Sequence, residues 1–466
     1  MLKLALRLEL RSLVRRKASL LALLGFLVTG MLAVVVGGQY TSQWQEAVRT
    51  AELEGAASAK EALAYLEAGK AGPEDRPWVD LSQPGWQDRY AGTRIVRLPG
   101  PLAGIASGAV DPAPAAFHIH SYADPMSTGG YRIENPELAA GAVDLVFVLA
   151  VLVPLLLSVL CLGIGGFERE LGLAPLVAVQ AGSLGGWWAA RTGAVALVVV
   201  LAVSGLCLVY SALGGATLAD VGGLLGLSGL YVLLWSGLIL ALYARAQTLR
   251  SAAFRFGLLW MAVCVLVPTL SAELMFTGIE ADYAVGETLG VRALSSEIRD
   301  EDVEEVLPKL YALHPDLRAL PAAADETFPA HLARYVHNAL LAEEMVARHR
   351  ARTEQESVAR SSADQSAWAS PAIGLGLAME RLAGVGTEAS ASYRGFLVDA
   401  LQARGRWILE RAWEKRPLEA SDFQALVKET PRSFQAAPAG LAGPLRALVG
   451  WTLFAWILAF FSVRKL

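Results

Sequence analysis

Two histidines and one cluster of charged residues have the side-chain types and spacing that could do chemistry. His118 and His120 alternate across one residue, so in a strand they would share a face, and imidazole is a common ligand of zinc and copper. Because no third ligand follows nearby, we interpret them as two solvated surface histidines. His331 and His337 are six residues apart on an expected helix and do not share a face well, so we interpret them as ordinary surface or core histidines.

Several motifs of enzymes and nucleotide-binding proteins do not occur in the sequence. It contains no GxxxxGK[ST] phosphate-binding loop, no HExxH zinc motif, no CxxC pair and no GxSxG nucleophile elbow. Its three cysteines lie inside apolar runs, where they behave as small apolar residues; they are Cys161, Cys207 and Cys264. We therefore expect that the chain is not an enzyme and has neither a cofactor of its own, a bound metal, nor a nucleic-acid partner.

The charged cluster lies in residues 167–191, between two apolar runs. Three adjacent charged residues, Glu168, Arg169 and Glu170, are expected at a helix exit, and Gly172 follows them. The segment ends at Arg191. Charges that snorkel to a membrane surface, together with an aromatic belt, explain this composition without any further role.

Six apolar runs surround these charged residues, and each has about the 20 residues that a lipid hydrocarbon core requires. The chain is 54% hydrophobic and 18% charged, with a mean hydropathy of +0.43, which exceeds the balance of a soluble domain. We therefore predict a mainly α, polytopic membrane protein with six transmembrane helices. These are residues 18–38, 142–166, three helices within 189–275, and a sixth that opens the segment 445–466.

Basic residues on the short flanks predict the orientation, because cytoplasmic flanks retain Lys and Arg. Such residues precede the first span, separate the fourth from the fifth and end the chain, so both termini are expected in the cytoplasm. Residues 1–17 have basic residues at every fourth position and leucines opposite, which predicts an amphipathic elbow helix on the inner surface. A signal peptide is disfavoured, since its apolar region would be shorter. We expect a bacterial inner membrane protein.

Two long acidic segments, 39–141 and 276–444, are expected on the outer side. The first predicts a small mixed α/β insertion, and the second predicts a larger helical one that includes an apolar stretch too short to span. The elements expected within them are helices at 42–69, 296–307, 329–362 and 390–415, strands at 93–98 and 116–122, and the apolar stretch at 369–382.

The segment 167–188 resembles the cytoplasmic loop of ABC-2 type transporter permeases, which has an acidic-basic-acidic triplet, Gly-Thr, a leucine-rich turn and a Lys that opens the next span. Glu168, Arg169, Glu170 and Gly172 match this pattern, and Arg191 stands where Lys is expected. Leu173 replaces the Thr and Pro175 interrupts the leucines. The resemblance extends to the subgroup with large insertions after the first and fifth spans, through Glu134-Asn135-Pro136, Gly141, Asp144-Leu145, Phe147-Val148, Pro154-Leu155-Leu156, Ser370-Pro371 and Leu382-Ala383-Gly384.

The resemblance implies a permease that forms half of a transmembrane dimer, with 167–188 as a coupling loop on a separate ATPase subunit that binds ATP and Mg. Glu168, Arg169, Glu170, Gly172 and Arg191 would then transmit motion to the membrane helices. We expect an ATP-driven exporter of an amphiphilic or envelope-directed substrate. The alternative is a mechanotransmitting subunit that acts on an envelope partner without transport. A homodimer and a heterodimer are equally open, and a secondary carrier is disfavoured because the centres of the spans hold no ionisable residue.

Overall fold

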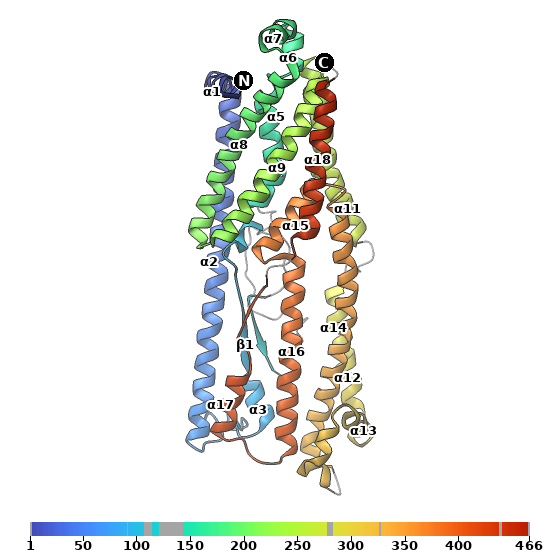
Figure 1. Cartoon of the computed structure of the whole chain (residues 1–466). Helices are drawn as coiled ribbons and strands as arrows, with labels where there is room; N and C mark the ends of the chain where they lie inside the picture. The colour runs from blue at the N-terminus through green and yellow to red at the C-terminus, as the bar shows by residue number, and fades with distance from the viewer. Residues whose placement is uncertain are drawn as a thin grey trace.

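The structure, a computed structural model, describes residues 2–90, 92–106, 114–120, 143–276, 283–325, 328–437 and 440–464. The fold is mainly helical and elongated, as Figure 1 shows. Apolar helices bundle in one half, the long polar segments occupy the other half, and both ends of the chain lie at the far end of the bundle.

Six helices are long and apolar enough to cross a membrane, which confirms the predicted number among the described residues. Four are continuous: α2 (Lys17–Glu67), α8 (Leu184–Gly214), α9 (Leu218–Arg245) and α18 (Ala442–Arg464). The other two contain a π-helical turn. One comprises α4 (Leu145–Phe147), π-helix Val148–Leu152, α5 (Val153–Cys161) and α6 (Gly166–Glu170), and the other comprises α10 (Leu249–Trp260), π-helix Met261–Leu266 and α11 (Val267–Phe276).

Each π-helical turn lies just before a proline, either Pro154 or Pro268. Proline has no N–H to donate and its ring crowds the carbonyl four residues earlier, so the preceding turn widens. The carbonyl of Ala150, four residues before Pro154, instead accepts a hydrogen bond from the hydroxyl of Tyr231 on α9 at 2.7 Å. The irregular turn therefore also links two helices of the bundle.

Helix α2 is a single helix of 51 residues that runs through both halves of the molecule (Figure 1). We expected a span at 18–38 and a separate helix at 42–69. No proline divides them, and the hydroxyls of Thr41 and Ser42 donate to the carbonyls of Gly37 and Gly38 in the preceding turn, at 3.0 and 2.9 Å. At about 1.5 Å per residue the helix is about 75 Å long, so roughly half of it extends beyond a 30 Å hydrocarbon layer.

The two long polar segments meet in one three-stranded sheet of order β2-β1-β3. Strands β1 (Thr93–Leu98) and β2 (Ala116–Ile119) come from the first segment and are antiparallel. Strand β3 (Ser433–Gln435) comes from the second segment and pairs with β1 in parallel. We call the sheet, the far half of α2 and the surrounding helices the outer body. Those helices are α3 (Pro84–Tyr90), α12 (Tyr283–Asp300), α13 (Val303–Leu313), α14 (Ala333–Ser366), α16 (Gly386–Trp413) and α17 (Ala420–Glu429).

A buried ion pair also joins the two segments. The Arg404 side chain on α16 donates to the Asp88 carboxylate on α3 at 2.5 Å, and both side chains are almost fully buried. A second nitrogen of Arg404 donates to the hydroxyl of Thr93 on β1 at 2.9 Å. Because a buried charge is costly unless it is paired, this contact fixes how the segments fit together.

Two elements of the second segment differ from our expectations. The acidic helix expected at 296–307 is divided between α12 and α13, because the Asp302 side chain caps α13 by accepting from the backbone N–H of Glu304 at 3.2 Å. The short apolar stretch forms α15 (Pro371–Ala383), which packs against α9 and α18 in the bundle. Its capping residue Ser370 donates to the carbonyl of Val263 in the second π-helical turn at 2.6 Å.

Candidate functional site

The charged segment forms two short helices at the end of the bundle where both chain ends lie (Figure 1). The triplet lies on α6, and residues further along form α7 (Ala174–Ala181). Helix α8 then begins at Leu184, earlier than the expected residue 189, because the Ser183 side chain accepts from the backbone N–H of Gly186 at 3.1 Å. Trp187 and Trp188 therefore belong to the first turns of α8.

Glu168 and Arg191 come together in a buried charge cluster with a third residue, Glu9. The Arg191 guanidinium pairs with both carboxylates, and the relative exposures are 1% for Glu9, 7% for Glu168 and 4% for Arg191. The indole N–H of Trp188 also donates to Glu168. Two acids and one base leave a formal charge of −1, so the positive charge of Arg191 is needed to stabilise the two buried carboxylates.

Glu9 lies on α1 (Leu2–Arg15), the elbow helix at the start of the chain. The face that packs against α8 presents Ala5, Glu9 and Leu13, which are buried at i, i+4 and i+8. The sequence pattern assigns leucines to the apolar face of this helix and predicts no role for Glu9. The available signal was that Glu9 is the only acid in a helix that otherwise has basic charges.

Arg169 and Glu170 contact the turn between α9 and α10. Arg169 donates to the carbonyl of Ala246, the C-capping residue of α9, at 2.7 Å, and its guanidinium lies 4.6 Å from the ring centroid of Trp188. Glu170 accepts from the backbone N–H of Leu249, the first residue of α10, at 2.8 Å. A cation at a helix C-terminus and an anion at a helix N-terminus both complement the helix dipole.

Gly172 forms the corner between α6 and α7. Its φ is +69°, a left-handed conformation that a residue with a Cβ adopts at a cost. The N–H of Gly172 donates to the carbonyl of Arg169 at 2.9 Å, and the N–H of Leu173 donates to the carbonyl of Glu168 at 2.8 Å. These two bonds form a Schellman motif, which ends α6 and redirects the chain into α7.

Helix α7 exposes apolar side chains at the end of the molecule. Every residue of this helix is at least partly exposed. Leu176 and Val179 are 56% and 82% exposed, and Leu171 and Leu173 before the helix are exposed as well. An apolar patch of this kind at a helix that packs only lightly on its own chain is typical of a contact surface.

The histidines do not form a comparable site. His118 on β2 and His120 directly after it are half-buried, not the solvated surface residues that we expect from the sequence, and their rings lie 5.5 Å apart. Burial lowers the pKa of His118 to about 4. His337 contacts the carbonyl of Glu301 at 3.2 Å, and His331 lies in a separate short 3₁₀ helix. Among the residues that the structure describes, no group of three or more His, Cys, Asp or Glu side chains could hold a metal ion.

The charged segment is therefore attached to several helices of the bundle, and we call this set of contacts the joint. Through Glu168 and Arg191 it is attached to α1 and α8, and through Arg169 and Glu170 to the turn between α9 and α10. Of the residues that carried the resemblance, Glu134, Asn135, Pro136 and Gly141 lie outside the described residues.

Part of the second long segment is similar to a known protein family. A family model described as a domain of unknown function (DUF3526) matches residues 279–428, about a third of the chain. No curated protein and no solved structure matches the chain. The matched segment contains most of the outer body and excludes the charged segment, and its description names no activity.

Proposed function

We propose that the chain is the membrane-spanning permease subunit of an ATP-driven exporter of the ABC-2 type. A separate ATPase subunit binds ATP and Mg and contacts α7. Two permease chains, identical or similar, form the transmembrane dimer in a bacterial inner membrane. Both termini and α7 face the cytoplasm, and the outer body faces the opposite side.

The observation that carries this proposal is the attachment of α6 to several helices at once. A displacement of α7 passes through the Gly172 corner to α6, which holds α1 and α8 through the buried charges and the α9–α10 turn through Arg169 and Glu170. A joint of this kind transmits motion if the partner contacts it differently in its ATP-bound and ATP-free states. The resemblance of the segment to the coupling loop of ABC-2 permeases agrees with this role.

The burial of Glu168 and Arg191 determines which part of the segment contacts the ATPase. These two residues hold the joint together inside the chain, so we assign the contact itself to α7. Leu176 and Val179 are exposed apolar residues of this helix. A partner that covers such a side chain completely stabilises the complex by about 1.5–3 kcal/mol.

A second function, mechanical transmission without transport, is favoured by α2. This helix is continuous from the bundle to the far end of the outer body. In addition Ser370, in the short link between α14 of the outer body and α15, donates a hydrogen bond to the second π-helical turn. A rigid connection of this length would let ATP turnover on one side move the outer body on the other. The outer body would then act on an envelope partner.

Co-purification with an ABC-type ATPase tests the proposal, and the first candidate is any such ATPase whose gene lies beside the gene of this chain. Val179→Glu places a charge in the α7 patch, and Leu53→Glu is the matched control because Leu53 is 63% exposed on the far half of α2. We expect Val179→Glu to weaken ATPase binding tenfold or more, since the charge loses its hydration in the contact, and Leu53→Glu to bind as the wild type does. Equal ATPase binding by both variants and the wild type would contradict the assignment of α7.

A transport assay distinguishes the exporter from the subunit that transmits motion without transport. Export of an amphiphile by vesicles that contain the permease and the ATPase supports the first. ATP-dependent change in the outer body without movement of any substrate, with capture of an envelope protein, supports the second.

A further inference from the structure

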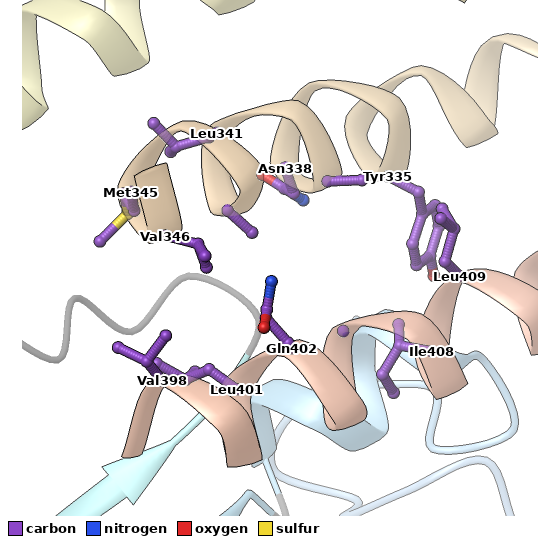
Figure 2. A pocket seen from close by; sticks show the side chains of 13 residues that line it. Tyr335, Asn338, Leu341, Met345, Val346, Val398, Leu401, Gln402, Ile408 and Leu409 are labelled. Carbon is purple, nitrogen blue, oxygen red and sulfur yellow. The ribbon is translucent and has the colours of Figure 1, made fainter. Parts of the chain in front are cut away.

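The outer body contains a narrow apolar crevice between α14 and α16. These antiparallel helices pack side by side, and their facing residues leave a half-open space of about 50 Å³. Figure 2 shows Met345 and Val346 on α14 opposite Val398 and Leu401 on α16, and Leu341 of α14 also lines the space. On α14 the lining extends from residue 335 to residue 346, about 16 Å along the helix, so the free space is long and thin.

Two amide side chains interrupt the apolar lining near its middle. Asn338 on α14 and Gln402 on α16 point into the gap from opposite sides (Figure 2). Ligand sites are mostly apolar with a few placed polar groups, and these amides offer both donors and acceptors. The lining is also adaptable, because Met345 is flexible and Gly405 has no side chain.

The crevice continues into a wider polar opening on the side nearer the helical bundle. Val398 and Gln402 line both spaces, and the opening adds His349, Arg350, Glu354 and Asp399 around about 430 Å³. This opening lies nearer the bundle, because α14 leads from here towards α15. Its charged side chains have both signs.

We propose that this crevice binds the single apolar chain of an amphiphile, with a zwitterionic headgroup in the polar opening. A thin apolar slot of this length matches an unbranched hydrocarbon chain better than a folded helix or an aromatic side chain. Arg350 complements the negative group of such a head, and Asp399 complements its positive group. The inference concerns ligand binding by the outer body and does not depend on coupling to an ATPase.

Gly405 provides the test and its control. A Cβ built at Gly405 meets no heavy atom within 4 Å, so a side chain at this position enters open space at the crevice. Gly405→Leu fills that space, whereas Gly405→Ala adds a single methyl group and raises helix propensity. The probe is lysophosphatidylcholine, and binding is measured with the full chain in lipid nanodiscs after subtraction of empty nanodiscs, with no ATPase present.

We expect the affinity of the wild type to rise about fourfold for each added methylene of the probe until the chain fills the crevice. Gly405→Leu should weaken binding at least tenfold, and Gly405→Ala should stay within twofold of the wild type. An alkyl alcohol of equal chain length should bind more weakly than lysophosphatidylcholine. Equal binding by Gly405→Leu, or equal binding of the alcohol, would overturn the assignment of the crevice or of the headgroup site, respectively.

Photo-crosslinking to the folded wild type gives a second measurement that does not depend on how a variant folds. A probe with a photoactivatable group at the end of its chain should label peptides from 335–346 and 398–409. Labelling only in other parts of the chain would overturn the proposal.

Discussion

Removal of the Arg191 guanidinium should be among the most damaging single changes in the bundle. Arg191→Met keeps most of the side-chain volume but leaves the carboxylates of Glu9 and Glu168 buried together without a cation. Breaking a buried ion pair from one side costs about 3–5 kcal/mol. Both acids are almost fully buried, so water offers little relief and we expect the upper part of this range.

The triple variant Glu9→Met, Glu168→Gln, Arg191→Met separates a charge effect from a packing effect. With no charge left, the cluster should recover most of the stability that Arg191→Met loses, because uncharged replacements of buried ion pairs are often neutral or stabilising. The Glu168→Gln change also keeps an acceptor oxygen for the indole N–H of Trp188.

The measurement is unfolding by sodium dodecyl sulfate in detergent micelles, followed by tryptophan fluorescence. The matched control is Arg11→Met, an exposed position on α1 that should change stability by no more than about 0.5 kcal/mol. If Arg191→Met cost less than about 1 kcal/mol, or if the triple variant were no more stable than the single one, the buried cluster would not hold the joint as described.

Three further changes test other parts of the structure. Arg404→Met removes the cation that pairs with the buried Asp88 and should destabilise the outer body by about 3–5 kcal/mol. Limited proteolysis should then cut both long segments faster. Unchanged proteolysis would contradict the packing of the two segments against each other. Gly172→Ala should lower the stability by about 1–2 kcal/mol, because alanine must adopt the φ of +69°, and it should also lower coupled ATPase activity. Gly182→Ala makes the corresponding change at the other end of α7, where φ is +70°. Burial lowers the pKa of His118 from 6.5 to about 4. As the pH falls, the imidazole therefore binds a proton in the unfolded chain before it does so in the folded chain. The outer body should lose up to about 3 kcal/mol of stability between pH 6.5 and 4. His118→Gln should remove that part of the pH dependence in urea unfolding, and an unchanged profile would show that His118 does not cause it.

The helices of the bundle are predictable from sequence because each is a continuous apolar run of sufficient length. The same applies to the position of the charged segment and to Gly172, since helix ends and glycine corners are local features. Local signals also locate β1 and the whole of β2, although the range expected for β2, 116–122, extends past its end at Ile119 and into residues 121–122, which lie outside the described residues.

Contacts between distant segments are not predictable in this way. The parallel pairing of β3 with β1 joins residues more than 300 positions apart, and β3 is only three residues long. Similarly, neither Asp88 nor Arg404 has a local pattern that identifies its partner. The long α2 was missed because its composition changes at the end of the apolar run while its hydrogen bonding does not.

Glu9 shows how tertiary structure assigns a role that periodicity does not. In sequence it is one acid on a basic amphipathic helix, where exposure to water is the ordinary expectation. In the structure its position places it opposite Arg191, and the ion pair explains why an acid occupies the buried face.

The most direct test of the central claim is the sidedness of α7 and of the outer body in intact cells. Val179→Cys and Leu53→Cys place single reactive thiols at exposed positions, and the three native cysteines are buried. We predict that a membrane-impermeant maleimide labels Leu53→Cys in intact cells and labels Val179→Cys only after the membrane is opened. Labelling of both positions in intact cells, or of Val179→Cys alone, would contradict a chain whose helices cross the membrane between these two ends.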